Sequence, residues 1–306
     1  MENLNKYIKM QNTKLTNSSY TFSGLFDIIH SNGDRIFAEF VSGFETIKVT
    51  YQEFKSYCLK MANYLVDKIH TDKNKFVGIN MENSINWLAC FWALLIIGYK
   101  PLLVNSRLPK SINDEIIKTM EVDTIISSVE CFDYLNEIVI GSSLKPNPDV
   151  LKCDEISSFN WADEIAITST ATSLNYKICI YRGSDLTYQA INAKSIIAKN
   201  SMLKAHYKGS LKLLAFLPFY HIYGLIATYL WFSVFGRTFV FLKDYSSDTI
   251  LKTIRYHNVT HIFAVPLLWH TISKEIKKKV NELSPKDKKK YDKGTKLSIK
   301  IQNLMV

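Results

Sequence analysis

The sequence contains no cysteine pair at the spacing of a metal site or of a disulfide framework. Its five cysteines are odd in number, lie far apart and include no C-x-x-C pair (Cys58, Cys90, Cys131, Cys153 and Cys179). This pattern argues against a disulfide-stapled secreted domain and a structural zinc site, so we expect no metal ligands. The polar N-terminus, residues 1–19, lacks the apolar stretch of a secretory signal. We therefore expect a cytoplasmic protein.

A hydrophobic run long enough to cross a membrane is also missing. The best candidate is the uncharged stretch 83–99, but it begins with Asn83 and Ser84 and meets Gly98 near its end. A membrane span needs ~20 predominantly apolar residues. A capping residue at one end and a glycine stop at the other predict a buried helix instead.

Acidic residues are scarce in the last part of the chain. Residues 271–306 contain eleven lysines and four acidic residues, so this tail carries +7 of the total net charge of +10. A solvated lysine-rich helix or linker is the simpler interpretation, although such a tail could also make weak contact with an anionic membrane surface. Aromatic and basic residues do not alternate as they do in single-strand-binding grooves, and we expect no nucleic-acid partner.

The remaining sequence alternates helix and strand patterns. The chain has 306 residues, of which 47% are hydrophobic, which argues against disorder. Thr50 to Glu53 forms a capping box before a helical apolar pattern. Short apolar runs then alternate with helical segments, at 76–79, 83–98, 101–104, 111–120 and 124–126. This order predicts a mostly parallel sheet with helices on both faces, preceded by a hairpin over 35–40 and 46–50.

A polar stretch divides the chain near its middle. Residues 141–161 include Pro146 and Pro148 and are predicted to link two subdomains. The same rhythm returns afterwards, with helices at 184–198, 222–235 and 246–256 and strands at 213–217, 238–242 and 261–265. We expect a polar extension (1–20), two α/β subdomains (21–150 and 151–270) and a lysine-rich helical or linker tail (271–306).

A polar loop without glycine lies between the apolar runs 165–167 and 178–180. From Ser169 to Lys177 it offers four hydroxyl side chains and one cation, which suit a polyphosphate. A simple polar turn is the alternative, because phosphate-binding loops are usually rich in glycine. A second feature, Pro218 to Leu225, places His221 where a strand gives way to an apolar helix, although a structural histidine would fit there too. Ligands of open α/β sheets bind beyond the carboxyl ends of strands, where both features are expected.

From about residue 22 to 270, these segments together resemble the adenylate-forming superfamily, specifically the fatty acid–CoA ligase branch of the AMP-forming acyl-CoA synthetases. The resemblance depends on the order and spacing of four segments. They are Thr50–Phe54, Val77–Ser84 with its continuation through Trp87 to Gly98, Pro101 and Asn105, Pro218–Leu225, and Thr260–Pro266. The resemblance implies the α/β N-terminal large domain of such an enzyme, incomplete at the C-terminus.

The resemblance also implies site residues and ligands. The family's phosphate loop, Thr-Ser-Gly-Thr-Thr-Gly-x-Pro-Lys, aligns with Ser169, Thr170, Ala171, Thr172, Ser173 and Lys177, so these residues would contact ATP. Ala171 and Leu174 replace its two glycines, and leucine is costly where a positive φ is needed. The acyl pocket would be bordered by Tyr220, His221, Gly224 and Leu225, with Ile222, Ile226, Tyr229 and Leu230 continuing the apolar stripe. ATP, Mg²⁺, coenzyme A and a fatty acid are the expected ligands.

Three segments of the family pattern are not found: Tyr-Gly-x-Thr-Glu, Thr-Gly-Asp and the C-terminal domain with its catalytic lysine. The chain thus resembles the first half of a ligase, and we expect no efficient acyl-CoA formation by it alone. A separate C-terminal half would be its natural partner. A catalytically inactive remnant that binds nucleotide or acyl chains, or an interaction protein that uses the lysine-rich tail, are the alternatives.

Overall fold

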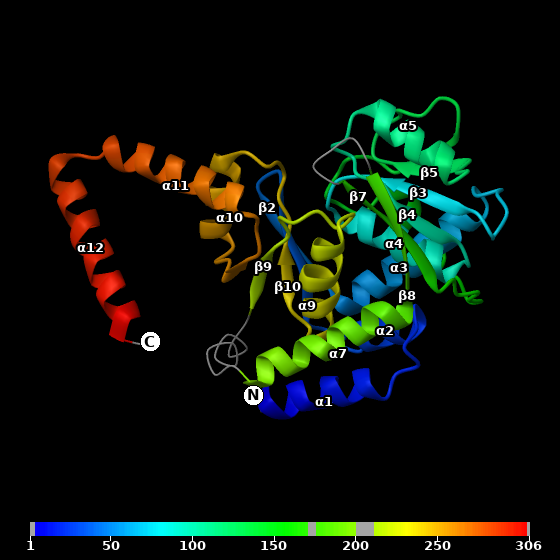
Figure 1. Cartoon of the computed structure of the whole chain (residues 1–306), viewed down its shortest axis with the longest axis horizontal. Coiled ribbons are helices and arrows are strands. Elements are labelled where there is room, and N and C mark those ends of the chain that lie inside the picture. The colour runs from blue at the N-terminus through cyan, green and yellow to red at the C-terminus, as the bar shows by residue number, and fades with distance from the viewer. Residues whose placement is uncertain (1–3, 171–175, 200–210, 305–306) are drawn as a thin grey trace.

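Two mostly parallel β-sheets with helices packed against them form the body of the molecule (Figure 1). The computed structural model describes residues 4–170, 176–199 and 211–304. The larger sheet has the order β6 (Asn136–Val139), β5 (Thr124–Ser127), β3 (Phe76–Asn80), β4 (Lys100–Leu103), β7 (Glu164–Thr170), β8 (Tyr176–Arg182). The smaller sheet has the order β11 (His261–Ile262), β9 (Lys212–Leu214), β10 (Thr238–Val240), β1 (Ile36–Ser42), β2 (Glu45–Thr50). The predicted α/β class is confirmed.

Nearly all neighbouring strands are parallel. Only β8 against β7 and β2 against β1 are antiparallel pairs within the described parts of the two sheets. Each sheet draws strands from both sides of residue 150, because β7 pairs with β4 and β10 pairs with β1. The polar stretch near the middle of the sequence therefore does not separate one sheet from the other. It contains the short helix α6 (Pro148–Leu151).

Helix α4 (Ile85–Ile96) forms the centre of the core, and all of its side chains are buried. Its cap is Ser84, whose Oγ accepts a hydrogen bond from the Trp87 N–H at 3.0 Å. It ends before Gly98, which has a φ of +86° and lies so close to Asn160 that a Cβ would be 2.7 Å from the Asn160 carbonyl oxygen. The predicted buried helix is confirmed. Across the described residues, no helix is long and apolar enough to cross a membrane.

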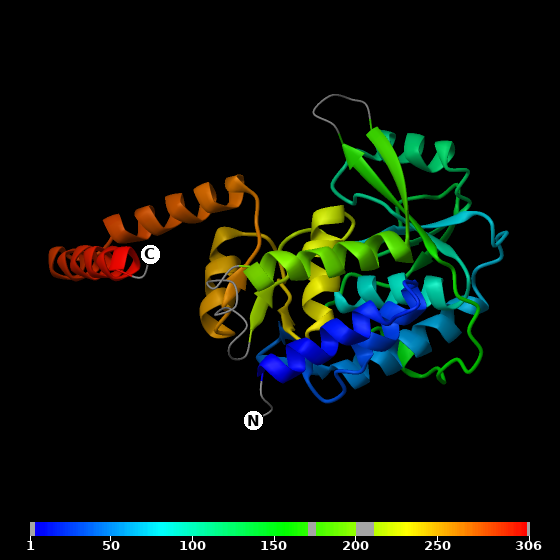
Figure 2. The same ribbon diagram turned by 60° about the horizontal axis from the view of Figure 1, so that its bottom comes forward.

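Other helices cover the faces of the sheets. Helix α3 (Tyr51–Val66) begins at the predicted capping box of Thr50 and packs along α4. Helix α5 (Lys110–Thr119) lies against the larger sheet on the side opposite to α7 (Gly183–Lys199) (Figure 1). Helix α7 in turn contacts α2 (Phe22–His30) and the π-helix η1 (Gly224–Leu230), which continues into α9 (Trp231–Val234). Figure 2 shows α7 running in front of η1 and above α1.

The N-terminal segment is part of the packed body, although its composition suggested only a polar extension. Helix α1 (Leu4–Thr16) lies along α7, with Gln11 and Leu15 buried. The Gln11 amide Nε2 donates hydrogen bonds to the Val234 carbonyl at 2.7 Å and to Asn32 Oδ1 at 3.2 Å. A buried glutamine thus satisfies the open C-terminal carbonyl of α9, which explains how so polar a helix docks.

Helix α12 (Pro285–Leu304) and the end of α11 (Pro266–Asn281) stand away from the sheets (Figures 1 and 2). Helix α10 (Ser247–Tyr256) packs beside the smaller sheet, and α11 contacts α10. Helix α12 follows, and its residues up to Leu297 are exposed. Within the described residues, most of the lysine-rich segment lies in α11 and α12.

Replacing Gln11 with alanine should lower the free energy of unfolding by about 1–3 kcal/mol, because the Val234 carbonyl would stay buried without this partner. Thr13→Ala on the exposed side of the same helix is the matched control and should cost well under 1 kcal/mol. Urea denaturation measures both values. Equal midpoints for the two variants would show that α1 docking contributes little to the fold.

Candidate functional site

The carboxyl ends of the parallel strands bring a charged cluster together. Glu82 follows β3, and Ser106 and Arg107 follow β4. The Arg107 guanidinium holds both Glu82 oxygens, with Nη2 at 2.8 Å from Oε2 and Nε at 3.1 Å from Oε1. The Ser106 hydroxyl donates a third hydrogen bond to Glu82 Oε1 at 2.8 Å. Such a two-pronged ion pair fixes the direction of both side chains.

This cluster also connects the larger sheet to the smaller one. Tyr245, which follows β10, lies under Arg107 with its ring centroid 4.2 Å from the guanidinium carbon. Burial alone would raise the pKa of Glu82, but the hydrogen bonds from Arg107 and Ser106 outweigh it and lower that pKa below its ordinary value. Burial raises the pKa of the neighbouring Tyr220 to about 12, so its phenol stays protonated at neutral pH.

Asn83 anchors the segment that contains the predicted acyl-pocket residues. Its side-chain amide donates to the carbonyls of Ala215 at 3.1 Å and Leu217 at 2.7 Å. Its Oδ1 accepts a hydrogen bond from the Phe219 N–H at 2.9 Å. The sequence indicated Asn83 only as part of a helix start, and its role in positioning residues 215–219 was missed. The signal available in the sequence was a polar residue placed directly between a predicted strand and an apolar helix.

Gly224 is required by close packing. A Cβ at this position would lie 2.0 Å from the Pro218 carbonyl oxygen, well inside any allowed contact. The turn that precedes it is closed by the His221 N–H, which donates to that same carbonyl at 3.1 Å. The π-helix η1 begins here, where an α-helix was predicted. Such wide turns are rare and often occur at functional sites.

The other predicted acyl-pocket residues are separated by this geometry. Tyr220 is buried, and its environment includes Ser106 and Arg107. His221 is exposed, and its Nδ1 accepts a hydrogen bond from the Tyr223 N–H at 3.3 Å. Leu225 is fully buried in the main hydrophobic core. These residues border one loop, but they do not share one surface.

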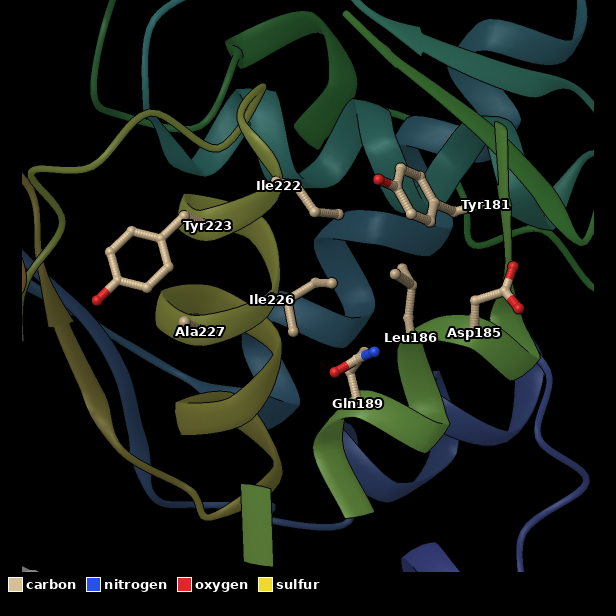
Figure 3. Close-up of a pocket in the computed structure, with 8 residues that line it drawn as sticks. All are labelled: Tyr181, Asp185, Leu186, Gln189, Ile222, Tyr223, Ile226 and Ala227. Atoms are coloured by element: carbon tan, nitrogen blue, oxygen red, sulfur yellow. The ribbon is translucent and has the colours of Figure 1, made fainter. Parts of the chain in front are cut away.

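A pocket of about 340 Å³ lies between η1 and α7 (Figure 3). Ile222 and Ile226 point from the η1 side toward Leu186 and the Tyr181 ring (Figure 3). Its complete lining is Tyr181, Asp185, Leu186, Gln189, Ile222, Tyr223, Ile226 and Ala227. The predicted apolar stripe therefore divides: Ile222 and Ile226 line the pocket, whereas Leu225, Tyr229 and Leu230 belong to the core.

The expected phosphate loop connects β7 and β8. Ser169 pairs with Lys177 and Thr170 pairs with Tyr176 across the hairpin, so both strands extend further than the apolar runs indicated. Ala171, Thr172, Ser173 and Leu174 lie outside the described residues. Lys177 is exposed at the carboxyl edge of β7. Lys177 and Tyr181 are four residues apart on the same face of β8, which corresponds to roughly 13 Å along the strand.

A second cavity, of about 670 Å³, opens at the carboxyl ends of strands from both sheets. Its walls follow β1, β3, β5, β6 and β10, and they include the hydroxyls of Ser42, Ser84, Ser128, Ser142 and Ser143 together with Lys243 and Tyr245. This edge cavity was not anticipated from the sequence, because its walls come from distant segments. Among the described residues, no three His, Cys, Asp or Glu side chains converge as metal ligands.

The sequence and the fold match a known family. The sequence model of the AMP-binding enzymes matches residues 27–301. Unliganded O-succinylbenzoate coenzyme A synthetase (MenE) from Bacillus subtilis is 19% identical with a TM-score of 0.63, over 85% of this chain and 53% of that chain. Apo MatB from Rhodopseudomonas palustris is 16% identical with a TM-score of 0.65, over 81% and 50%.

A third similar structure contains a bound ligand. The N-terminal subdomain of NpsA from Klebsiella oxytoca, in complex with 3-hydroxybenzoyl-AMSN, is 17% identical with a TM-score of 0.62, over 80% of this chain and 59% of that chain. MenE has also been solved with ATP and magnesium ion and with its acyl-adenylate intermediate. At these identities the likeness shows the fold, and the chain spans about half the length of the MenE and MatB structures.

Gly224→Ala should lower the free energy of unfolding by about 3 kcal/mol, because a rigid backbone carbonyl occupies the space of the new methyl group. Gly294→Ala in α12 is the control, since nothing lies within 4 Å of its added Cβ. The control should be neutral or gain up to about 1 kcal/mol of helix stability. An unchanged urea midpoint for Gly224→Ala would contradict the close packing at Pro218.

Glu82→Gln should reduce stability by about 1 kcal/mol at neutral pH, since the half-exposed pair with Arg107 is partly screened by solvent. Because the pKa of Glu82 is lowered in the folded protein, the ion pair contributes its full stability at a pH above about 4.3, the pKa of an unfolded glutamate. This contribution is lost as the pH falls through the lower pKa of the folded protein. The gap between wild type and variant should therefore close in acid. Urea midpoints across a pH series test this, with exposed Glu45→Gln as control. A gap of constant size at every pH would rule out the ion pair as its source.

Proposed function

The chain belongs to the AMP-binding enzyme family, and we propose that it is the N-terminal part of a ligase that activates a carboxylic acid with ATP. The observation that supports this most directly is the β7–β8 hairpin. It carries Lys177 opposite Ser169 at the carboxyl edge of a parallel sheet, which is where such sheets bind ligands. The face of β8 that carries Lys177 also carries Tyr181 of the apolar pocket.

We propose that the loop holds the β- and γ-phosphates of ATP. Thr172 and Ser173 would supply hydroxyl groups, and Lys177 would supply the positive charge, with Ser169, Thr170 and Ala171 completing the loop. Mg²⁺ usually binds through substrate phosphates with few protein ligands, which fits the lack of an acidic cluster among the described residues. When bound, the ion would offset phosphate charge during the transfer.

The pocket between α7 and η1 is the proposed site of the acyl group. Its aliphatic walls suit a hydrocarbon, and Ile222 and Tyr223 directly follow the exposed His221. Tyr220 and Gly224 would shape the entrance, and Leu225 would support it from the core. The resemblance of the sequence to fatty acid–CoA ligases favours a fatty acid as the substrate, and the cysteine pattern favours a cytoplasmic setting.

The proposed reaction has two steps. A carboxylate oxygen of the acid attacks the α-phosphorus of ATP, the bond between the α-phosphorus and the bridging oxygen breaks, and pyrophosphate leaves. The thiol of coenzyme A then loses its proton to solvent, its sulfur attacks the acyl carbonyl carbon, and AMP leaves with the electrons of the broken acyl–oxygen bond. This chain would contribute by holding the acid in line with the phosphates. Such positioning supplies much of the lowering of the activation barrier in reactions between two bound reactants.

The lysine-rich helices support a second, weaker role. Helix α12 projects from the body and exposes its lysines together with Tyr291 and Leu297, so it could rest on an anionic membrane surface. A polypeptide that supplies the missing family segments is the other proposed partner.

Titration with Mg·ATP by calorimetry tests the nucleotide role. Lys177→Met should weaken binding roughly ten- to a hundredfold, as expected for the loss of a charge-assisted contact. Lys48→Met replaces an exposed lysine on β2 of the other sheet and should leave the affinity unchanged. A dissociation constant within about twofold of wild type for Lys177→Met would reject the phosphate role of Lys177. Failure of the wild-type chain to bind Mg·ATP would favour the alternative of an interaction protein that uses the lysine-rich tail.

A further inference from the structure

The pocket between α7 and η1 limits the length of acid that it can hold, provided that the acid binds there as proposed above. Its volume is about 340 Å³, near the lower end of the usual range for small-molecule pockets. At ~30 Å³ for each water-sized group, it has room for about eleven such groups. That is fewer than the carbon atoms of a hexadecanoyl chain.

The wall of the pocket formed by Ile222 and Ile226 is backed by the main hydrophobic core, against which both side chains pack. This core contains Leu225 and Tyr229, whose side chains are both fully buried. Tyr229 is fixed there because its hydroxyl accepts a hydrogen bond from the Trp92 Nε1–H at 2.6 Å. A longer chain would have to displace these close-packed side chains, and cores resist such overpacking. Extra carbons can therefore only continue outward along α7.

The outward path is polar. Asp185 and Gln189 lie one turn apart on α7 and form the polar part of the lining, and both are exposed (Figure 3). The Asp185 carboxylate already accepts a hydrogen bond from the Arg182 N–H at 2.8 Å, which holds it at the start of the helix. A hydrocarbon chain laid across these two residues would cover polar groups without replacing their hydrogen bonds to water, which is unfavourable.

We propose that the pocket selects acids with an acyl part of about ten non-hydrogen atoms or fewer, and that Gln189 determines this limit. Short and medium straight-chain acids and ring-sized acids meet the condition. Longer fatty acids gain nothing from the additional carbons, because these carbons reach Gln189 and solvent.

Equilibrium binding of straight-chain acids tests the limit without requiring catalysis. The series runs from butanoic to hexadecanoic acid, each kept below its micelle-forming concentration and measured by equilibrium dialysis with labelled acid. Each buried methylene should tighten binding about fourfold until the pocket is full. Beyond about ten carbons the dissociation constant of the wild-type chain should level off or rise.

Two variants move the limit in opposite directions. Gln189→Leu makes the rim apolar, so the fourfold steps should continue for further carbons, whereas Ala227→Leu fills the pocket and should end them earlier. Gln52→Leu, on α3 and outside this pocket, adds the same leucine elsewhere and should leave the profile unchanged. Equal steps through hexadecanoic acid in the wild type, or a limit that stays in place in Gln189→Leu, would overturn the inference. No binding of any acid would instead reject the proposed acyl pocket itself, while Mg·ATP binding remains a separate measurement.

Discussion

The three hydrogen bonds of the Asn83 side chain join the larger sheet to the smaller one, and the position of the candidate site depends on this connection. Asn83 ends the βα connection of the larger sheet, and its partners Ala215, Leu217 and Phe219 follow β9 of the smaller sheet. A buried amide with its donors and acceptor all satisfied is stabilising, whereas its partners would be costly to leave unpaired. The loop through Pro218, the contact at Gly224 and the start of η1 all lie downstream of this anchor.

Much of the fold could be predicted from the sequence, because local signals and burial agree over long stretches. The capping box at Thr50, the uncharged helix after Ser84 and the glycine at position 98 each mark a boundary that the structure retains. Strand pairing was harder, since hydrophobic pattern sets which faces are buried but not which strands become neighbours. The polar stretch 141–161 therefore gave no indication that β7 pairs with β4 or that β10 pairs with β1 across it.

The candidate site was predictable in part. Hydroxyls and a lysine between two apolar runs indicated the hairpin that the structure contains, and the apolar residues after His221 indicated a pocket wall. The error lay in the helical period. A π-helix has a wider turn than an α-helix, so residues three apart no longer share the same face, whereas residues four apart still do. Ile222 and Ile226 consequently line the pocket, while Leu225 and Tyr229 turn into the core. The steric need for Gly224, which starts this wide turn, depends on a contact with Pro218 that is visible only in three dimensions.

The same wide turn explains why the pocket is both apolar and small. Tyr229 must reach Trp92 for its hydrogen bond, and this fixes the inner side of η1 against the central helix α4. The outer side then faces α7, which is itself held by its contacts with α1 and α2. Close-packed residues therefore lie behind both walls, and η1 and α7 cannot move apart without breaking buried contacts. A pocket of this kind discriminates by size. If an acid binds here as proposed, the few side chains at the open end set which acids fit, while the proposed phosphate loop and the ion pair of Glu82 and Arg107 remain the same for any acid.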